Sequence, residues 1–399
     1  MSTAGLLLAS LRARPGATLL TVLLVALGLA TATIVTLATT QLEARLERDA
    51  RGVDLVVGAK GSRLQLVLAG VWHLDVPPGN VPLAAVDELR AMPGVAQAIP
   101  LALGDSFRGF RIVGTEPAFV ELQRARLARG APADAPMRAV LGADVAAATG
   151  LDVGARFAGT HGLAEGGAEH GEDAFTVSGV LAPTGGVVDR LILTPLESVW
   201  RVHEGEPADD EERRELEASR EVTMVLVRYA TPLAAATLPR RVDASDRLQA
   251  ASPALEAARL FRLVGVGLDG ARAFGALLLA MAALSVFVAL FQALSDRRRE
   301  LALMRLLGAS PARLFGLLVG EGLATTALGA ALGVALGHGA VELAGAWLAP
   351  RGELPLTGRD FATIEWAWIG GTLALGALAA AVPARLAART PPADVLADD

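Results

Sequence analysis

The sequence predicts an α-helical membrane protein with four transmembrane helices plus a large α+β extracytoplasmic domain inserted between helices 1 and 2. Three observations indicate this fold class. Apolar residues make up 53% of the 399 residues, while charged residues still make up 20%, which is typical of membrane spans joined to a water-exposed domain. Four apolar runs are each long enough to cross a bilayer. Between the first two runs, residues 41–270 have the mixed composition of a soluble domain.

Charge and cysteine content exclude several classes of function. The net charge is −6, which argues against nucleic acid as the main partner, because binding to phosphates needs a basic face. The chain has no cysteine, so it has no disulfide framework, no thiolate metal site and no cysteine nucleophile. No Ser/His/Asp arrangement stands out either, and we expect a non-catalytic membrane subunit.

The first two spans are uninterrupted by charge. No residue between Arg14 and Glu43 is charged, so the N-terminal segment 1–40 contains transmembrane helix 1. The alternative is a cleaved signal peptide, whose apolar core is normally about 7–15 residues and therefore shorter than this run. The second span is predicted over 273–295, between Arg272 and Asp296.

The third apolar run, between Arg313 and Arg351, is longer than the first two and contains ionisable residues. Three ionisable residues interrupt it: Glu321, His338 and Glu342. Two spans would need roughly 40 residues plus a turn, so we expect one span over about 316–340 that continues as an interfacial helix to Trp347. The fourth span is predicted over 366–384, beginning at a tryptophan that would anchor it at the interface.

The distribution of arginine orients these spans. Arginines gather before span 1, between spans 2 and 3, and after span 4: Arg12, Arg14, Arg297, Arg298, Arg299, Arg305, Arg313, Arg385 and Arg389. In the loop between spans 3 and 4, Arg351 and Arg359 are offset by Glu353 and Asp360. The positive-inside rule therefore places both termini and the 296–313 loop in the cytoplasm, and residues 41–270 outside.

The external segment alternates strand-like and helix-like patterns. Strands are predicted over 55–57, 95–103, 107–113, 139–141, 175–181, 190–193 and 222–229, and helices over 82–91, 116–127 and 143–149. Gly104 and Asp105 are predicted to form the turn between the second and third of these strands. Residues 204–220 favour a solvated loop or a short helix, and 255–270 a helix continuous with span 2. This alternation indicates an α+β domain, as one body or two small lobes.

The loop after span 2 predicts a short amphipathic helix over 296–307. Gly308 would end it in a left-handed conformation, and Ser310 followed by proline would begin the next helix. Leu303, Leu306 and Leu307 share one face of the short helix. Two interpretations stay open at this point: a basic helix lying on anionic lipid, or a coupling helix that docks into a groove of an ATPase.

Two motifs in this part of the chain carry a family resemblance. Residues 299–309 read Arg-Glu-Leu-Ala-Leu-Met-Arg-Leu-Leu-Gly-Ala, and residues 383–396 read Pro-Ala-Arg-Leu-Ala-Ala-Arg-Thr-Pro-Pro-Ala-Asp-Val-Leu. Both resemble motifs of the MacB/FtsX/LolC–LolE permeases, the type VII ABC transporters, and Glu321 falls where that family's third span usually has a glutamate. The layout also resembles it, with a MacB-like periplasmic domain over 41–270 and an FtsX-like domain over 271–399.

The resemblance implies a function, a set of partners and a location. It implies a permease subunit that couples ATP hydrolysis by a separate ATPase chain to motion of its periplasmic domain, for extrusion or release of a lipoprotein, peptide or small molecule. The alternatives are an FtsX-like regulator of a cell-wall hydrolase and a receptor-like protein without an ATPase. The implied location is the bacterial inner membrane. The implied partners are an ABC ATPase, a second permease copy (a homodimer in preference to a heterodimer), membrane lipids and a periplasmic or outer-membrane partner.

The resemblance also assigns the residues that contact the ATPase: Arg298, Arg299, Glu300, Leu303, Met304, Leu306, Leu307 and Gly308. No Gly-x-x-x-x-Gly-Lys-Ser/Thr pattern occurs in the sequence, and Lys60 is the only lysine. We therefore expect no cofactor in this chain, with ATP and Mg bound by the partner ATPase.

Three further features have competing interpretations. Span 3 has glycines four residues apart, which let helix backbones approach closely, within the chain or across a dimer axis: Gly316, Gly320, Gly329, Gly333 and Gly337. The alternative to a packing role is that these glycines reflect the general glycine richness of transmembrane helices.

Glu321 is expected to make a structural hydrogen bond to a neighbouring span rather than to transfer protons. His161 and His170 are zinc-ligand types in a glycine-rich segment, but their spacing matches no closed site, so no firm metal site is predicted.

Overall fold

The computed structural model describes residues 12, 14–161, 169–204, 209–296, 303–348 and 356–389. The chain divides into two compact units: a membrane unit, Met1–Glu43 with Val264–Asp399, and an insert domain, Ala44–Leu263. Each boundary falls inside a helix rather than in a loop, because α2 (Pro15–Asp49) and α10 (Pro253–Asp296) both continue through it.

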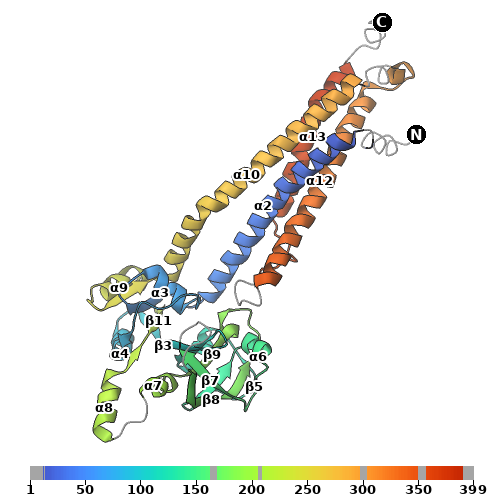
Figure 1. Cartoon of the computed structure of the whole chain (residues 1–399). Coiled ribbons are helices and arrows are strands. Elements are labelled where there is room, and N and C mark those ends of the chain that lie inside the picture. The colour runs from blue at the N-terminus through green and yellow to red at the C-terminus, as the bar shows by residue number, and fades with distance from the viewer. Residues whose placement is uncertain are drawn as a thin grey trace. The chain divides into compact units, whose positions relative to one another are not determined.

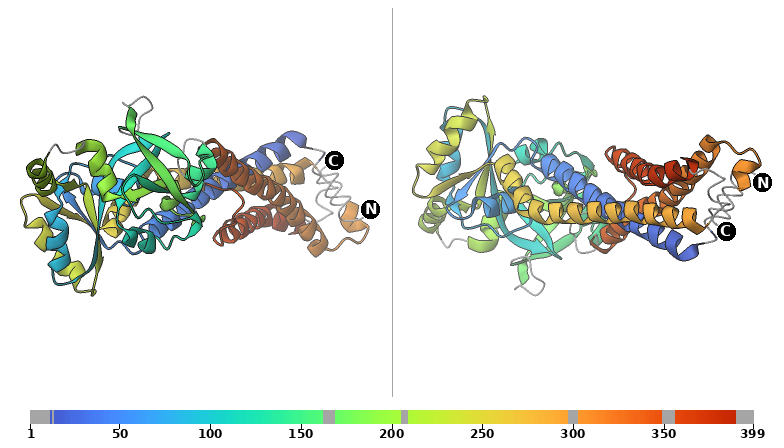
Figure 2. Two further views of the ribbon diagram at one scale, coloured as in Figure 1. Left: turned by 90° about the horizontal axis from the view of Figure 1, so that it is seen from below. Right: turned by 90° about the horizontal axis from the view of Figure 1, so that it is seen from above.

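Four helices of the described residues are long and apolar enough to cross a membrane, which confirms the predicted fold class. They are α2, α10, α12 (Pro311–Leu348) and α13 (Glu365–Arg389). The third run is one continuous helix, as expected from its length. In Figures 1 and 2, α2 is blue and the three later helices run from yellow-orange to red.

Small side chains bring these helices together. Val25 and Leu29 of α2 are buried in a cluster with Ala282 of α10 and Ala330 of α12. A second cluster joins α10, α12 and α13 through Val286, Leu290, Leu318, Ala380, Ala384 and Ala387. Because lipid is as apolar as these side chains, close packing rather than hydrophobic burial holds such helices together.

The insert domain is built on one mixed sheet. Its ten described strands are β1 (Leu55–Ala59), β3 (Val95–Phe107), β4 (Phe110–Thr115), β5 (Leu127–Gly130), β6 (Arg138–Leu141), β7 (Arg156–His161), β8 (Glu169–Leu181), β9 (Leu191–Pro195), β11 (Met224–Tyr229) and β12 (Leu248–Ala251). The order is β12-β1-β11-β3-β4-β9-β6-β8-β5, with β7 paired to β3 and β8. The pairs β4–β9 and β6–β8 are parallel and the others are antiparallel. A separate pair joins β2 (Val81–Pro82) to β10 (Glu221–Val222).

Helices cover this sheet and divide its core into two. They are α3 (Arg63–Gly70), α4 (Ala84–Ala91), α5 (Pro117–Leu122), α6 (Ala143–Thr149), the 3₁₀ helix η1 (Val187–Arg190), α7 (Leu196–Glu204), α8 (Asp210–Ser219) and α9 (Ala234–Asp243). One buried cluster includes Leu55, Val86 and Val225, and the other includes Ile112 and Phe175. The two lobes left open by the sequence are therefore two hydrophobic cores on one shared sheet.

The predicted turn at Gly104 and Asp105 is wrong. Strand β3 runs through both residues to Phe107, with a bulge between Leu103 and Ser106. The hairpin turns instead at Arg108 and Gly109, which have φ of 49° and 81°, as a tight hairpin turn requires. Pairing of Asp105 with His161 of β7 keeps this part of β3 extended, so the glycine marks a bulge and not a turn.

The predicted helix over 116–127 is too long. Helix α5 ends at Leu122, and Arg124 has a φ of 51°, which no α-helix accommodates. The chain then enters β5, whose pairing with β8 outweighs the helical pattern of the sequence.

For residues 204–220 the sequence left a solvated loop or a short helix open. The short helix is correct, because α8 forms there, and it has no buried residue.

Candidate functional site

Residues 303–308 form a sharply defined helix end in the described part of the loop between α10 and α12. The Ala309 amide donates to the Met304 carbonyl at 2.9 Å, and the Gly308 amide donates to the Arg305 carbonyl at 3.1 Å. Gly308 has a φ of 95°. Together these features are a Schellman motif, in which glycine takes the left-handed position. The predicted left-handed stop at Gly308 is confirmed.

The next helix begins where the sequence predicts. Ser310 precedes α12, and its hydroxyl accepts a hydrogen bond from the Arg313 amide at 3.3 Å, while Pro311 occupies the first helical position. Three predicted coupling residues lie outside the described residues, and their roles stay predictions: Arg298, Arg299 and Glu300.

The leucines of this segment are turned outward. Leu303, Leu306 and Leu307 are 51%, 61% and 88% exposed. On the other side, Met304 is half-buried, and a guanidinium N–H of Arg305 donates to the Ala388 carbonyl at 3.4 Å. The segment therefore contacts the end of α13 through Arg305, while the three leucines on its other face are more than half exposed. Exposed leucines at this density indicate a surface that another molecule covers.

Three glycines in the middle and C-terminal half of α12 face α2. A Cβ added at Gly329 would lie 2.6 Å from Val25 Cβ, and one at Gly333 would lie 2.7 Å from the Ala26 carbonyl oxygen. At Gly337 the nearest atom would be Thr33 Cβ, also at 2.7 Å. These three positions therefore permit close approach of α12 to the protein's own first span.

The other two predicted glycines differ. Nothing lies within 4 Å of a Cβ added at Gly316, and Gly320 is half-buried. Packing of these two across a dimer axis stays a prediction.

Glu321 lies in the N-terminal half of α12, beside a small cavity that α2 and α10 also line. Arg14, Thr18 and Thr21 belong to the same lining. The guanidinium of Arg14 donates to the carbonyls of Ala289 and Gln292, at 3.3 and 3.2 Å, and so joins α2 to α10. A basic and an acidic side chain therefore line one cavity in the bundle, and the structural hydrogen bond expected from Glu321 to a neighbouring span stays a prediction.

A polar cluster lies near the C-terminal end of α12, and the sequence did not predict that its residues meet. His338 Nε2 lies 2.8 Å from a carboxylate oxygen of Glu365, which is 1% exposed, and its Nδ1 lies 2.6 Å from the Gly358 carbonyl. Glu342 accepts hydrogen bonds from the Gly358 amide and from Arg359. The cluster ties the chain before α13 to α12. Its only sequence signal is the four-residue spacing of His338 and Glu342, which puts them on one helix face.

Comparison with known proteins agrees with this architecture. Residues 18–245 match the family model for the MacB-like periplasmic core domain, and residues 272–392 match that for the FtsX-like permease C-terminal domain. The chain belongs to the MacB/FtsX-like permease family. This permease is thus a multi-pass membrane subunit of ABC type, and its insert domain is a periplasmic domain. No protein of curated function matches the chain in sequence.

Three solved structures are similar to the insert domain of this permease. The periplasmic region of MacB from Actinobacillus actinomycetemcomitans is 11% identical, with 54% of this chain and 97% of that chain covered and a TM-score of 0.36. The extracellular domain of the noncanonic ABC-type transporter YknZ from Gram-positive bacteria is 12% identical, with 50% and 98% covered and a TM-score of 0.29. A domain described as part of a permease from Porphyromonas gingivalis is 18% identical, with 51% and 89% covered and a TM-score of 0.29.

The two histidines of this permease end up on neighbouring strands. His161 ends β7 and His170 lies at the start of β8, and Thr160 pairs with Glu169 between these strands. Their side chains lie outside the described residues, and the described part of the chain has no cluster of three or more potential ligands of the His, Cys, Asp or Glu type. Zinc binding by His161 and His170 therefore stays a prediction.

Proposed function

We propose that this permease couples ATP hydrolysis by a separate ABC ATPase chain to motion of its periplasmic domain, for extrusion or release of a lipoprotein, peptide or small molecule. One observation carries the proposal: the outward-facing leucines of the segment that ends at Gly308. Full burial of one exposed leucine contributes about 1.5–3 kcal/mol, and these three are between half and almost fully exposed, so covering them contributes several kcal/mol to docking of a partner protein. The sequence predicts that this segment belongs to a coupling helix over 296–307, and we use the name coupling helix for it.

The helices support transmission of force from such a partner. The Schellman turn and the Ser310 cap join the coupling helix to α12 with little freedom. Helices α2 and α10 each continue without interruption from the membrane unit into the insert domain. A displacement at the cytoplasmic ends of the helices is therefore carried by hydrogen-bonded helix rather than by flexible linker.

The proposal includes location, cofactors and assembly. The permease lies in the bacterial inner membrane with both termini in the cytoplasm, and two copies assemble, as a homodimer, with two ATPase chains. ATP and Mg bind to the ATPase, because the sequence has no phosphate-binding loop of the Walker type. Membrane lipids and a periplasmic or outer-membrane protein complete the set of partners.

Co-purification tests the proposed partner. The full-length permease, expressed in its own host and solubilised in mild detergent, is expected to retain an ABC ATPase in about equal amount. Quantitative mass spectrometry of the purified complex measures this ratio. A cell-wall hydrolase recovered together with the ATPase would favour regulation over transport, and a preparation free of any ATPase would contradict the proposal.

The proposed orientation is tested with single cysteines, because the natural chain contains none. Ala218→Cys, on exposed α8, is expected to react with a membrane-impermeant maleimide on cells whose outer membrane is permeabilised. Ala312→Cys, on the exposed first turn of α12, is expected to react only after lysis. Labelling of Ala312→Cys in unlysed cells would show that the orientation is inverted.

A further inference from the structure

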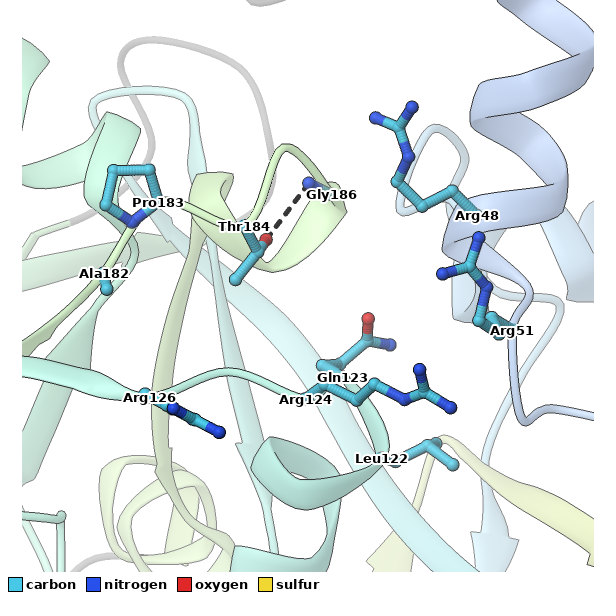
Figure 3. A pocket seen from close by; sticks show the side chains of 10 residues that line it. All are labelled: Arg48, Arg51, Leu122, Gln123, Arg124, Arg126, Ala182, Pro183, Thr184 and Gly186. Atoms are coloured by element: carbon cyan, nitrogen blue, oxygen red, sulfur yellow. Dashed lines mark hydrogen bonds between the residues drawn. The ribbon is translucent and has the colours of Figure 1, made fainter.

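A basic pocket lies in the insert domain, where the end of α2 meets the loops after α5 and β8. Its volume is about 300 Å³. Four arginines line it: Arg48, Arg51, Arg124 and Arg126. Figure 3 shows Arg48 and Arg51 on one side of the pocket and the other two arginines, on the segment after α5, on another. No aspartate or glutamate is among the lining residues.

Nearby carboxylates are occupied by other groups. Buried Asp49 accepts a hydrogen bond from the Val187 amide at 3.0 Å and pairs with Arg45 at 3.6 Å. Buried Asp189 accepts hydrogen bonds from the amides of Thr184 and Gly185, at 2.9 and 2.7 Å. Both carboxylates therefore hold the wall of the pocket in place, and Asp49 has one of the lining arginines, Arg48, as an electrostatic partner.

The guanidinium groups keep most of their donors available. Arg48 uses one N–H, which donates to the Gly185 carbonyl at 2.9 Å, out of five. Within the described residues, Arg51, Arg124 and Arg126 form no ion pair with a carboxylate. Four exposed guanidiniums that line one pocket give it a positive potential, which favours the entry of an anion.

The backbone at two walls of the pocket has a defined conformation. Arg124 has a φ of 51°, a region in which glycine or asparagine is favoured over a long side chain. The turn on the opposite wall is rigid, because the Thr184 hydroxyl donates to Asp189 and accepts from the Gly186 amide. This wall of the pocket is therefore pre-formed, so binding of an anion would order the exposed arginine side chains and little of the backbone.

We propose that this pocket binds a phosphate-bearing group. The planar, bidentate fork of arginine matches phosphate oxygens, and four guanidiniums call for more negative charge than a single carboxylate supplies. Arg48 and Arg51 lie at and just beyond the end of α2, the helix that also forms the first span, so two sources share this chemistry. One is the headgroup of an anionic phospholipid, and the other is a free phosphate compound.

Calorimetric titration of the full-length permease, in nanodiscs of phosphatidylcholine, tests the site. One arm uses inorganic pyrophosphate, and the other compares soluble dihexanoyl phosphatidylglycerol with dihexanoyl phosphatidylcholine. We expect Arg124→Gln/Arg126→Gln to weaken anion binding by about tenfold or more, since each charge-assisted hydrogen bond is strong. Arg51→Gln alone serves as a second variant if the double variant does not fold.

The matched control is Arg214→Gln/Arg241→Gln, which removes the same charge from exposed sites on α8 and α9. Binding of pyrophosphate without the lipid assigns the pocket to a free phosphate compound, and preference for phosphatidylglycerol over phosphatidylcholine assigns it to a headgroup. The proposal is overturned if the unchanged permease binds neither probe, or if the control variant loses as much affinity as the pocket variant.

Discussion

Replacing Leu303 and Leu306 of the coupling helix by aspartate is expected to detach the partner ATPase and to abolish coupled ATP hydrolysis. Docking can bury only the exposed half or so of each leucine, which contributes about 1.5–3 kcal/mol for the two together. An aspartate in an apolar groove adds a desolvation cost, so we expect a loss of affinity of at least about tenfold. Both side chains are more than half exposed in the free permease, so aspartate there does not disturb its core. The ATPase retained per permease, and the hydrolysis rate of the purified complex, measure the effect.

Three controls sharpen this test. Leu306→Met keeps apolar area and is expected to retain the ATPase. Leu233→Asp makes the same chemical change at a leucine that is 72% exposed in the insert domain, and it should leave the complex intact. Arg298→Ala should weaken the complex only slightly and in a salt-dependent way, because an exposed ion pair contributes about 0–1 kcal/mol. Full retention of the ATPase in Leu303→Asp and in Leu306→Asp would mean that the coupling helix lies on lipid instead.

Gly333→Val in α12 is expected to destabilise the membrane unit by about 3 kcal/mol, near the upper end for overpacked sites. The first added carbon would already lie 2.7 Å from the Ala26 carbonyl oxygen and 3.0 Å from Leu29 Cβ. The oxygen belongs to the backbone of α2, so relief requires the whole helix to move. The midpoint of unfolding by sodium dodecyl sulfate in mixed micelles, followed by circular dichroism, reports the loss.

The same helix supplies the matched control. Nothing lies within 4 Å of a Cβ added at Gly339, which is exposed. Gly339→Val therefore changes helix propensity alone, by a few tenths of a kcal/mol at most, and should leave the unfolding midpoint unchanged. Equal midpoints for the two variants would show that α2 and α12 do not pack through Gly333.

Local chemistry explains which structural features could be predicted. A span is a property of consecutive residues, because each must be apolar to enter lipid, and so the four membrane helices follow from composition. The stop at Gly308 is equally local, since left-handed φ is accessible to glycine at little cost. The cap at Ser310 depends on an amide only three residues away.

Long-range pairing explains the features that were missed. Gly104 and Asp105 have the composition of a turn, but β7 pairs with β3 at this point and keeps it extended. The hydrogen bond between His338 and Glu365 links residues 27 positions apart, and the basic pocket joins Arg48, in α2, to Arg126, which follows α5. Neither hydrophobic periodicity nor residue spacing predicts contacts between residues so far apart in the sequence.

The sequence by itself determined the four membrane helices, the place of the inserted domain and the turn that presents the leucines, because each depends on hydropathy or on the conformational preference of one or two residues. Only the tertiary structure decided that α2 is the partner of Gly333, that one sheet carries two cores, and that four arginines surround one pocket. These features depend on which distant segments pack together, and that choice is made by the free energy of the whole fold rather than by any short stretch of it.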